Sequence, residues 1–429
     1  MGQLTSWSRE YKRPLHACFV DLKRAYDSVH RHTLWFILRH QGVPAKLVDL
    51  LQDLHTGSTA TVKAFGGESR PFEIKGGVRQ GCNIAPLLFN IFLDFVTKQA
   101  ASQFASTATG WKGGVSFRFN FQGEPFKVPV GELGTMELVA LLLYADDMVL
   151  LAESAEELNH YVQVLDAVTQ RWGLTINVRK TKTWRGSWAM PCTGPPAPTP
   201  GARIRGEALE LVEDFKYLGS TLADSGGLDK ELSRRWALAT AKFAELQLIW
   251  CHKRMSLATK MCFYRAFITP TLLYGCESWP TTKAQEDKLN VFHMRCLRRI
   301  LGVSIRHRLR NEHIVARCGI QQVPALISSA RMRWAGHLIR MGNERLPKKI
   351  LFGALAEGKR GRGKPRKRLA DKYESDFHAL AQANGFAAPS RPTRATTGKV
   401  SQSWWTPAAD KLKWRACIDS AWPRKPPAP

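Results

Sequence analysis

The sequence predicts an α+β first half followed by an all-α region. Short apolar runs alternate with helical patterns up to about residue 224, and three long period-3.6 segments follow at 228–250, 257–268 and 283–301. The third observation is charge. Of a formal net charge of +27 over 429 residues, +17 lies between residues 295 and 368, where 20 Lys and Arg stand against three Glu. A chain this basic predicts a polyanionic partner, nucleic acid first and an anionic membrane surface second.

The first predicted elements are a strand, two helices, a hairpin and a third helix. The apolar run Cys18-Phe19-Val20, which ends at Asp21, predicts a buried strand. Two helical patterns follow, one with Leu34, Ile37 and Leu38, and one with Leu47, Leu50, Leu51 and Leu54 on one face before Gly57. Segments 59–65 and 71–75 predict a hairpin, and Pro86 suits the first turn of a helix that runs through Phe95.

A second hairpin and a fourth helix complete the first half. The apolar segments 138–143 and 148–152 flank Tyr144-Ala145-Asp146-Asp147, which predicts two strands with these four residues at the tip. Ser154 and Glu157 form a capping box that opens a helix ending at Gly173. A Pro-rich insertion is expected at about 186–206, a mobile basic segment at 358–368, and a flexible segment at 386–403.

Cysteine spacing and the length of the apolar runs exclude several classes of protein. Nine cysteines, an odd number without any CxxC, argue for reduced thiols in an intracellular protein and against a disulfide framework. A set made of Cys296, His307, His313 and Cys318 fits no standard zinc spacing. The longest apolar run, 138–145, is far shorter than the roughly 20 residues that span a bilayer, so no membrane partner is expected.

The strongest chemical feature is a set of three aspartates at the ends of predicted strands. Asp146 and Asp147 are adjacent at a hairpin tip, where like charges repel and burial is costly. Asp21 ends another apolar strand, and neighbouring strands of one sheet would bring it beside Asp146. Two or three carboxylates on a rigid sheet are the ligands that Mg²⁺ prefers. The alternatives are a solvated turn for the pair and a helix N-cap for Asp21, but the combination favours a metal site.

Five segments, in order, resemble the reverse transcriptases of non-LTR (LINE-type) retrotransposons. They are FVDLKRAYDSVHRHTL (19–34), GGVRQGCNIAPLLFNIFLD (76–94), LLLYADDMVLLAES (141–154), GLTINVRKTKTW (173–184) and FKYLGSTL (215–222). Weaker similarity continues through 272–279, 296–303, 331–341 and 358–368. The resemblance implies a right-hand polymerase palm with partial fingers over residues 1–224 and a helical thumb over 225–305. It also implies a basic, partly disordered nucleic-acid-binding region over 306–429.

The resemblance also implies roles for residues of the palm. Asp21, Asp146 and Asp147 would hold two Mg²⁺ (or Mn²⁺) ions about 3.5–4 Å apart, which activate a primer 3′-hydroxyl and stabilise the leaving pyrophosphate. Either Lys180 or Lys182 would protonate that pyrophosphate, unless both are merely solvated. The nucleotide pocket would comprise Leu22, Tyr26, Gln80 and Gly81, and the primer grip Tyr217, Leu218 and Gly219. The Tyr26 ring would exclude a 2′-hydroxyl, the alternative being an ordinary packed aromatic residue.

Basic residues of the second half are predicted to contact nucleic acid. They are Arg295, Arg298 and Arg299 on one helical face, Arg331 and Arg333 beside Trp334, and Lys364, Arg366, Lys367 and Arg368 in the basic segment. A solvated face for the first three residues, a core position for Trp334 and a nuclear-localisation signal for the basic segment stay open as alternatives.

The function implied by the resemblance is RNA-directed DNA polymerisation. The partners would be an RNA template, a DNA primer or target and dNTPs, within an intracellular ribonucleoprotein of the nucleus, the cytoplasm or both. Because the chain begins 20 residues before Asp21, the family's fingers and endonuclease are expected to be missing. The alternatives are an inactive, truncated remnant that only binds nucleic acid, and a related maturase or telomerase-like polymerase.

Overall fold

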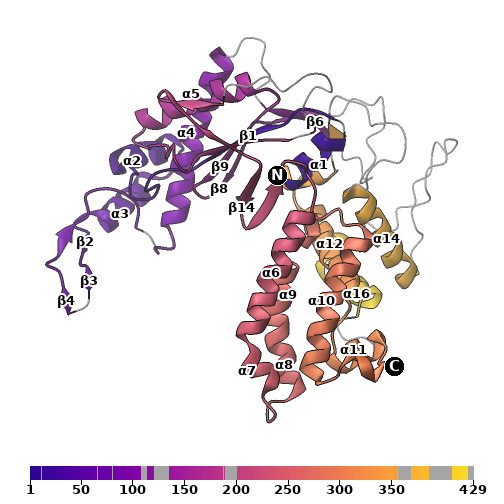
Figure 1. The fold of residues 1–429 in the computed structure, drawn as a ribbon. Coiled ribbons are helices and arrows are strands. Elements are labelled where there is room, and N and C mark those ends of the chain that lie inside the picture. Colours follow the sequence, from indigo (N-terminus) through magenta and orange to yellow (C-terminus); the bar gives the residue numbers. More distant parts are fainter. Residues whose placement is uncertain are drawn as a thin grey trace. The chain divides into compact units, whose positions relative to one another are not determined.

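The chain forms two compact units (Figure 1). The computed structural model describes residues 1–10, 12–64, 66–79, 81–107, 114–119, 135–186, 188, 201–352, 354–355, 369–385 and 408–423. We call Arg13–Ser116 with Glu137–Glu213 the sheet unit, and Met1–Lys12, Phe117–Met136 with Asp214–Pro429 the helical unit. The three-domain division predicted from the sequence stays a prediction.

The sheet unit is built on a five-stranded sheet. Its strand order is β13-β10-β1-β9-β8, with β1 His16–Val20, β8 Leu141–Tyr144, β9 Asp147–Ala152, β10 Lys182–Arg185 and β13 Glu210–Val212. The first predicted strand, β1, is central and antiparallel to both neighbours, β9 and β10. The second hairpin predicted from the sequence, over residues 138–152, corresponds to β8 and β9, which pair directly. Segments 125 residues apart in the sequence, around Asp21 and Asp146, therefore meet in one sheet.

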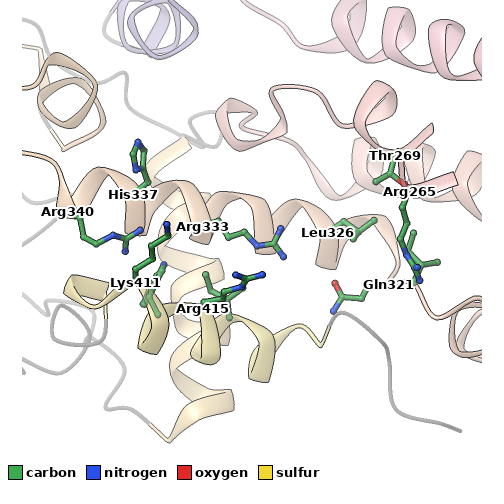
Figure 2. Close-up of a pocket in the computed structure, with 12 residues that line it drawn as sticks. Arg265, Thr269, Gln321, Leu326, Arg333, His337, Arg340, Lys411 and Arg415 are labelled. Atoms are coloured by element: carbon green, nitrogen blue, oxygen red, sulfur yellow. The ribbon is translucent and has the colours of Figure 1, made fainter. Parts of the chain in front are cut away.

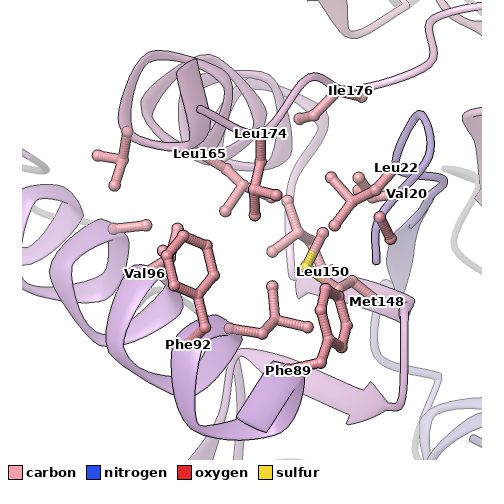
Figure 3. Close-up of a cluster of buried hydrophobic side chains, with 14 of the residues drawn as sticks. Val20, Leu22, Phe89, Phe92, Val96, Met148, Leu150, Leu165, Leu174 and Ile176 are labelled. Carbon is pink, nitrogen blue, oxygen red and sulfur yellow. The ribbon is translucent and has the colours of Figure 1, made fainter. Parts of the chain in front are cut away.

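Alternation along β1 and β9 directs one set of side chains into a core beneath two helices, α4 (Ala85–Thr107) and α5 (Ala155–Arg171). Val20, Met148 and Leu150 lie on this face, and Figure 3 shows them facing Phe89 and Phe92 of α4. All of these side chains are at most 3% exposed. At about 1.5–3 kcal/mol for each fully buried large apolar side chain, this packing fixes the strands on which the aspartates stand.

Two further helices and two small ribbons complete the predicted first half. The helices are α2 (Arg31–His40) and α3 (Ala45–His55), and the ribbons pair β2 (Thr59–Ala60) with β5 (Phe72–Glu73) and β3 (Lys63–Ala64) with β4 (Gly67–Glu68). The leucine face of α3 is largely exposed at Leu47, Leu50 and Leu54, whereas Val48 and His55 are buried. At the start of α5, Ser154 caps the helix as predicted, but the Glu157 carboxylate accepts from the N–H of Glu153 rather than Ser154.

The helical unit contains the long predicted helices, in places subdivided. Its helices are α1 Gly2–Glu10, α6 Asp229–Glu245, α7 Gln247–Cys251, α8 Leu257–Phe263, α9 Thr269–Leu272, α10 Lys283–Leu301, α11 Asn311–Cys318, α12 Val323–Arg340, α13 Leu346–Phe352, α14 Leu369–Asn384 and α16 Lys411–Ala421. A π-helix, η2 (Tyr264–Ile268), continues α8 directly. The short 3₁₀ turns are η3 Cys276–Ser278 and η4 Ile305–His307. None of the described helices has the length and apolarity needed to cross a membrane.

The remaining described strands are short. They are β6 Val115–Phe119, β7 Thr135–Val139, β11 Arg203–Ile204, β12 Glu207–Ala208, β14 Asp214–Tyr217, β15 Ser220–Ala223 and β16 Ala354–Leu355. The ribbons β11–β12 and β14–β15 are both antiparallel. The second ribbon belongs to the helical unit and carries the residues predicted as a primer grip at its turn.

Candidate active site

The register of β1 against β9 brings the three predicted catalytic aspartates together. Val20 pairs with Met148 at the end of the ladder, so the next residue, Asp21, faces Asp147 across the strand ends. Ala145 and Asp146 form the two-residue turn of the β8–β9 hairpin. Asp147 begins β9 and pairs with Tyr144 of β8. The sequence prediction that Asp21 lies beside the aspartate pair is thus met by the pairing of these strands.

The hairpin tip has a backbone conformation that L-residues rarely adopt. Ala145 has φ of 53°, in the left-handed region that normally favours glycine. Such a residue costs about 1–2 kcal/mol and persists only where surrounding structure enforces it. Here Met148 to Ala152 of β9 are all buried, and the pairing of Tyr144 with Asp147 closes the turn.

Electrostatic interaction links the three carboxylates. Partial burial, together with the carboxylates of Asp146 and Asp21, raises the pKa of Asp147 above its usual value. A raised carboxyl pKa means that the anionic form is unfavourable at this place. A bound cation would reverse that preference by stabilising all three anions at once.

The carboxylate oxygens of the three aspartates are suitable ligands for a divalent cation, but the described side chains are not arranged around one position. Carboxylate oxygens on adjacent strand ends are the hard ligands that Mg²⁺ accepts. Among the described residues, however, no three His, Cys, Asp or Glu side chains are close enough together to hold a metal. Rotation of the exposed Asp146 and Asp147 side chains would be needed to group the three aspartates.

The loop before β10 holds Asp21 through two residues, Asn177 and Thr181, that were not predicted as part of the site. Asn177 Nδ2 donates to Asp21 Oδ2 at 3.1 Å, and its backbone N–H donates to Asp21 O at 2.8 Å. The backbone N–H of Asp21 in turn donates to Thr181 Oγ1 at 3.2 Å. Both residues lie within the GLTINVRKTKTW segment, so the motif marks the loop, but nothing in the residue types distinguishes them.

The structure distinguishes the two candidate lysines. Lys180 Nζ lies 4.0 Å from Asp21 Oδ2, and the lysine side chain is 71% exposed. Lys182 Nζ instead donates to Arg179 O at 2.8 Å and to Glu210 Oε2 at 2.5 Å. Lys180 is therefore the lysine beside the carboxylates, and Lys182 joins β10 to β13.

A second loop follows Asp21 and carries Leu22 and Tyr26, two of the four residues predicted for the nucleotide pocket. The Tyr26 ring is half-buried and stacks on Phe89 with ring centres 4.6 Å apart. Tyr26 O accepts from the N–H of Val78, and at Gly77 (φ 75°) a Cβ would overlap the backbone of Tyr26 and Asp27. The glycine is thus required for the two loops to approach.

The other residues predicted for the nucleotide pocket differ in burial. Leu22 is 7% exposed and bridges to Ile176, so it packs in the core. Gly81 is exposed and has φ of 84°, with open space around it. Gln80 lies outside the described residues.

A family model described as reverse transcriptase (RNA-dependent DNA polymerase) matches residues 3–222, just over half of the chain. The chain belongs to the reverse transcriptase family. The resemblance to retrotransposon enzymes predicted from the motifs is confirmed. The match contains all three aspartates, Lys180 and the primer-grip segment at 217–219.

Curated relatives of this reverse transcriptase chain come from mobile elements. A transposon-derived protein of Caenorhabditis elegans is 25% identical over 65% of this chain and 94% of its own length. The RNA-directed DNA polymerase from mobile element jockey of Drosophila funebris is 24% identical over 70% of this chain. This chain spans about 30% of the jockey protein's length. Among solved structures, telomerase from Candida tropicalis is 12% identical with a TM-score of 0.38, covering 81% of this chain and 50% of the telomerase.

The segment predicted as a primer grip is a tight turn within the helical unit. Leu218 (φ 47°) and Gly219 (φ 78°) form the turn between β14 and β15. Leu218 O accepts from the Tyr274 hydroxyl at 3.1 Å, and Gly219 O accepts from Arg234 at 2.8 Å and from Arg235. These contacts satisfy the turn's carbonyl oxygens and fix its shape.

Two features of α6 hold that turn in place. Arg235 and Glu231 are buried and paired at 2.6 Å. Glu231 Oε2 also accepts from the N–H of Thr221 in β15 at 2.8 Å. The Arg235 guanidinium lies 4.5 Å from the centre of the Tyr274 ring. The turn is therefore rigidly supported by α6 and Tyr274.

The basic residues predicted to contact nucleic acid divide into exposed and buried ones. Arg295, Arg299 and Arg333 are exposed, and Arg298 donates to Asn311 Oδ1 at 2.8 Å. Arg331 is 1% exposed and pairs with Asp376 at 2.9 Å. A buried, paired arginine has no access to a phosphate, so in this structure Arg331 stabilises the fold.

Several other predicted residues and segments lie outside the described residues. They are Lys364, Arg366, Lys367 and Arg368 of the segment 358–368, the Pro-rich run 191–200 and the segment 386–403. Trp334 is half-buried, with its ring against His337.

Proposed function

We propose that this chain is the polymerase part of an RNA-directed DNA polymerase of a LINE-type retrotransposon. It would extend a DNA primer 3′-hydroxyl with dNTPs on an RNA template, within an intracellular ribonucleoprotein of the nucleus, the cytoplasm or both. The single observation that carries the proposal is the β1–β9 register, which brings Asp21 beside Asp146 and Asp147 at the strand ends.

Mg²⁺ is the cofactor that the three aspartates would hold, with Mn²⁺ as a substitute of similar ligand preference. Such ions lower the pKa of a bound hydroxyl and neutralise charge on the leaving pyrophosphate. Asn177 would keep the Asp21 carboxylate oriented toward the strand ends, since it bonds both to the side chain and to the backbone of that residue.

The remaining residues would position the substrates. Lys180, 4.0 Å from Asp21, would supply a proton to the leaving pyrophosphate. The Tyr26 ring, held by stacking on Phe89, would lie against the nucleotide sugar and exclude a 2′-hydroxyl. The Leu218–Gly219 turn would hold the primer end through backbone contacts.

Primer extension on an RNA template tests the proposal. Asp146→Asn is expected to reduce dNTP incorporation by at least about a hundredfold, the scale of losing a charge-stabilising group in an active site. Asp53→Asn, which removes an exposed carboxylate from α3, is the matched control and should leave incorporation unchanged. Full activity of Asp146→Asn would show that the carboxylate assignment is wrong.

A second candidate function is nucleic-acid binding without polymerisation. It is favoured by the charge of the segment 295–368, in which 20 Lys and Arg stand against three Glu. It predicts salt-sensitive binding of RNA, no dNTP incorporation with either Mg²⁺ or Mn²⁺, and no effect of Asp146→Asn on affinity.

A further inference from the structure

A groove between α12 and α16 gathers cations without acidic neighbours in its lining. It has a volume of about 730 Å³ and is lined by residues of α12, of α16 and of the η2–α9 segment. Five of the lining residues are cationic: Arg265, Arg333, Arg340, Lys411 and Arg415. Of the described residues that line it, none is acidic. We call this feature the α12–α16 groove.

The cations are arranged along the length of the groove. Arg333 and Arg340 follow one face of α12, and Lys411 and Arg415 follow the facing side of α16 (Figure 2). Leu326 and Arg340 on that α12 face are 14 residues apart, which is about 21 Å of helix. At about 3.4 Å per nucleotide of a stacked strand, this length accommodates about six nucleotides.

The same helix also carries an arginine of the opposite kind, one that is buried in the core. Arg331, two residues before Arg333 and on the opposite face of α12, is neutralised by Asp376 of α14 at 2.9 Å and by Glu286 of α10 at 3.6 Å. Acidic partners thus exist in this unit for an arginine that is built into the core. Five cations line this groove, with the Asp410 carboxylate near Arg340 at one end. A polyanion would complement a lining that is predominantly positive.

The floor and one end of the groove have features of a binding site. Trp414 and Ile418, which line the floor, are at most 2% exposed, so the groove combines an apolar base with a cationic rim. At one end Thr269 Oγ1 is buried and has no hydrogen-bond partner among the described residues. It directly follows the π-helix η2, a distortion that is often found at functional sites. An unsatisfied buried hydroxyl in a cationic groove is explained if a ligand oxygen bonds to it.

We infer that the α12–α16 groove binds one single strand of nucleic acid, with phosphates on the arginines and bases against the apolar floor. A single strand is favoured because its unpaired bases are free to contact apolar lining residues such as Leu326, whereas the bases of a duplex are stacked inside it. Arginine is suited to the role because its planar fork binds a phosphate through two donors. The choice of nucleic acid over other polyanions rests on the proposed function.

The site is built by close packing of α16 onto α12. The Trp414 indole Nε1 donates to Met332 O at 2.8 Å, and it lies directly against Gly336. Arg340 donates to Ala408 O at 2.8 Å, just before α16. Both contacts set the distance between the two rows of cations, which makes the groove a preformed feature of this unit.

Fluorescence anisotropy with a labelled single-stranded RNA of about ten nucleotides, using the full chain without dNTPs, tests the inference. The groove variant Arg333→Glu/Arg415→Glu is compared with Lys253→Glu/Arg254→Glu. The second variant makes the same change in charge at exposed residues of the α7–α8 turn, away from the groove. We expect the groove variant to bind at least about tenfold more weakly. Its slope of log affinity against log salt should be less steep by about 1.4, the value for two phosphate contacts of a single strand.

Equal losses in the two variants would mean that net charge alone controls binding, and would overturn the inference. Because charge reversal can disturb packing, Arg333→Gln/Arg415→Gln provides a second variant whose urea midpoint should match that of the wild type. It too should bind the strand more weakly, and unchanged affinity would likewise overturn the inference.

Two further ligands test the choice of a single strand. If the groove variants lost affinity for duplex DNA or for phosphatidylserine vesicles while single-strand binding was retained, the ligand assignment would be wrong. Since binding is measured without dNTPs, a chain that binds through the groove yet never extends a primer would contradict the proposed function alone.

Discussion

Arg331→Met is expected to destabilise the helical unit strongly while leaving single-strand binding intact. The Arg331 guanidinium donates to Asp376 Oδ2 at 2.9 Å, to Thr281 Oγ1 at 2.8 Å and to Trp279 O at 3.1 Å. Its side chain is 1% exposed, so methionine of similar length keeps the packing but leaves these acceptors facing an apolar group.

The magnitude follows from what remains after the guanidinium is removed. Breaking a buried ion pair by deleting one partner typically costs about 3–5 kcal/mol. Here Asp376 still accepts from Ser328 Oγ at 2.6 Å, and Glu286 still accepts from Lys372 Nζ at 2.8 Å. Glu286 also accepts from Thr281 Oγ1 at 2.5 Å, so each remaining carboxylate keeps at least one partner. We therefore expect the lower end of the range, about 3 kcal/mol. Against a typical total stability of about 5–15 kcal/mol, this is a large effect.

Urea denaturation of the full chain measures the effect, and Arg333→Met is the matched control. Arg333 is two residues along the same helix and exposed, so its replacement should change stability by less than about 0.5 kcal/mol. Single-strand affinity, measured where both variants are folded, should fall for Arg333→Met and stay unchanged for Arg331→Met. A wild-type urea midpoint combined with lost RNA binding in Arg331→Met would refute the assignment of this arginine to the core. The double variant Arg331→Met/Asp376→Leu should recover part of the lost stability, because it also removes the unpaired carboxylate.

Four other substitutions have outcomes that the structure predicts. Gly77→Ala should cost more than about 1 kcal/mol in urea denaturation and lower primer extension, whereas Gly81→Ala, also at positive φ but in open space, should cost less. Gly336→Ala should destabilise the chain and weaken single-strand binding instead of giving the usual helix gain of about 1 kcal/mol, since its Cβ would overlap the Trp414 indole. Burial lowers the pKa of His293 from 6.5 to about 4, so the unfolded chain takes up a proton first as pH falls. About 3 kcal/mol of stability present above pH 6.5 should then be lost toward pH 4, and His293→Gln should flatten that part of the urea-midpoint profile.

The catalytic part of the site was predictable because its signals are local. The strand ending at Asp21 and the hairpin around Asp146 each have a clear apolar pattern, and both strands form where expected. Their mutual register was not predictable from pattern alone, since residues 125 apart in the chain must pair. The motif resemblance supplied that information, and strand pairing in the structure agrees with it.

Asn177 and the leucine face of α3 show where the sequence was insufficient. Asn177 bonds to Asp21 from a loop more than 150 residues away, and an asparagine before a strand is otherwise ordinary. In α3, period-3.6 spacing correctly predicts a helix, but Leu47, Leu50 and Leu54 are exposed. Periodicity shows that a face is apolar, and the neighbouring elements decide whether that face is covered.

Arginines of α12 show why charge read from sequence locates a binding region but not its contacts. Arg331 and Arg333 have the same side chain and lie two residues apart, so the sequence assigns them the same role. Helical geometry places them on opposite faces of α12. Arg331 faces Glu286 of α10 and Asp376 of α14, the latter 45 residues away in the sequence. Arg333 faces the α12–α16 groove. Pairing within the fold removes Arg331 from the charge available to a ligand, whereas Arg333 faces α16, which adds two further cations. The net charge of a segment is therefore an upper bound on its attraction for nucleic acid. The residues to test are those whose neighbours across the groove are also basic.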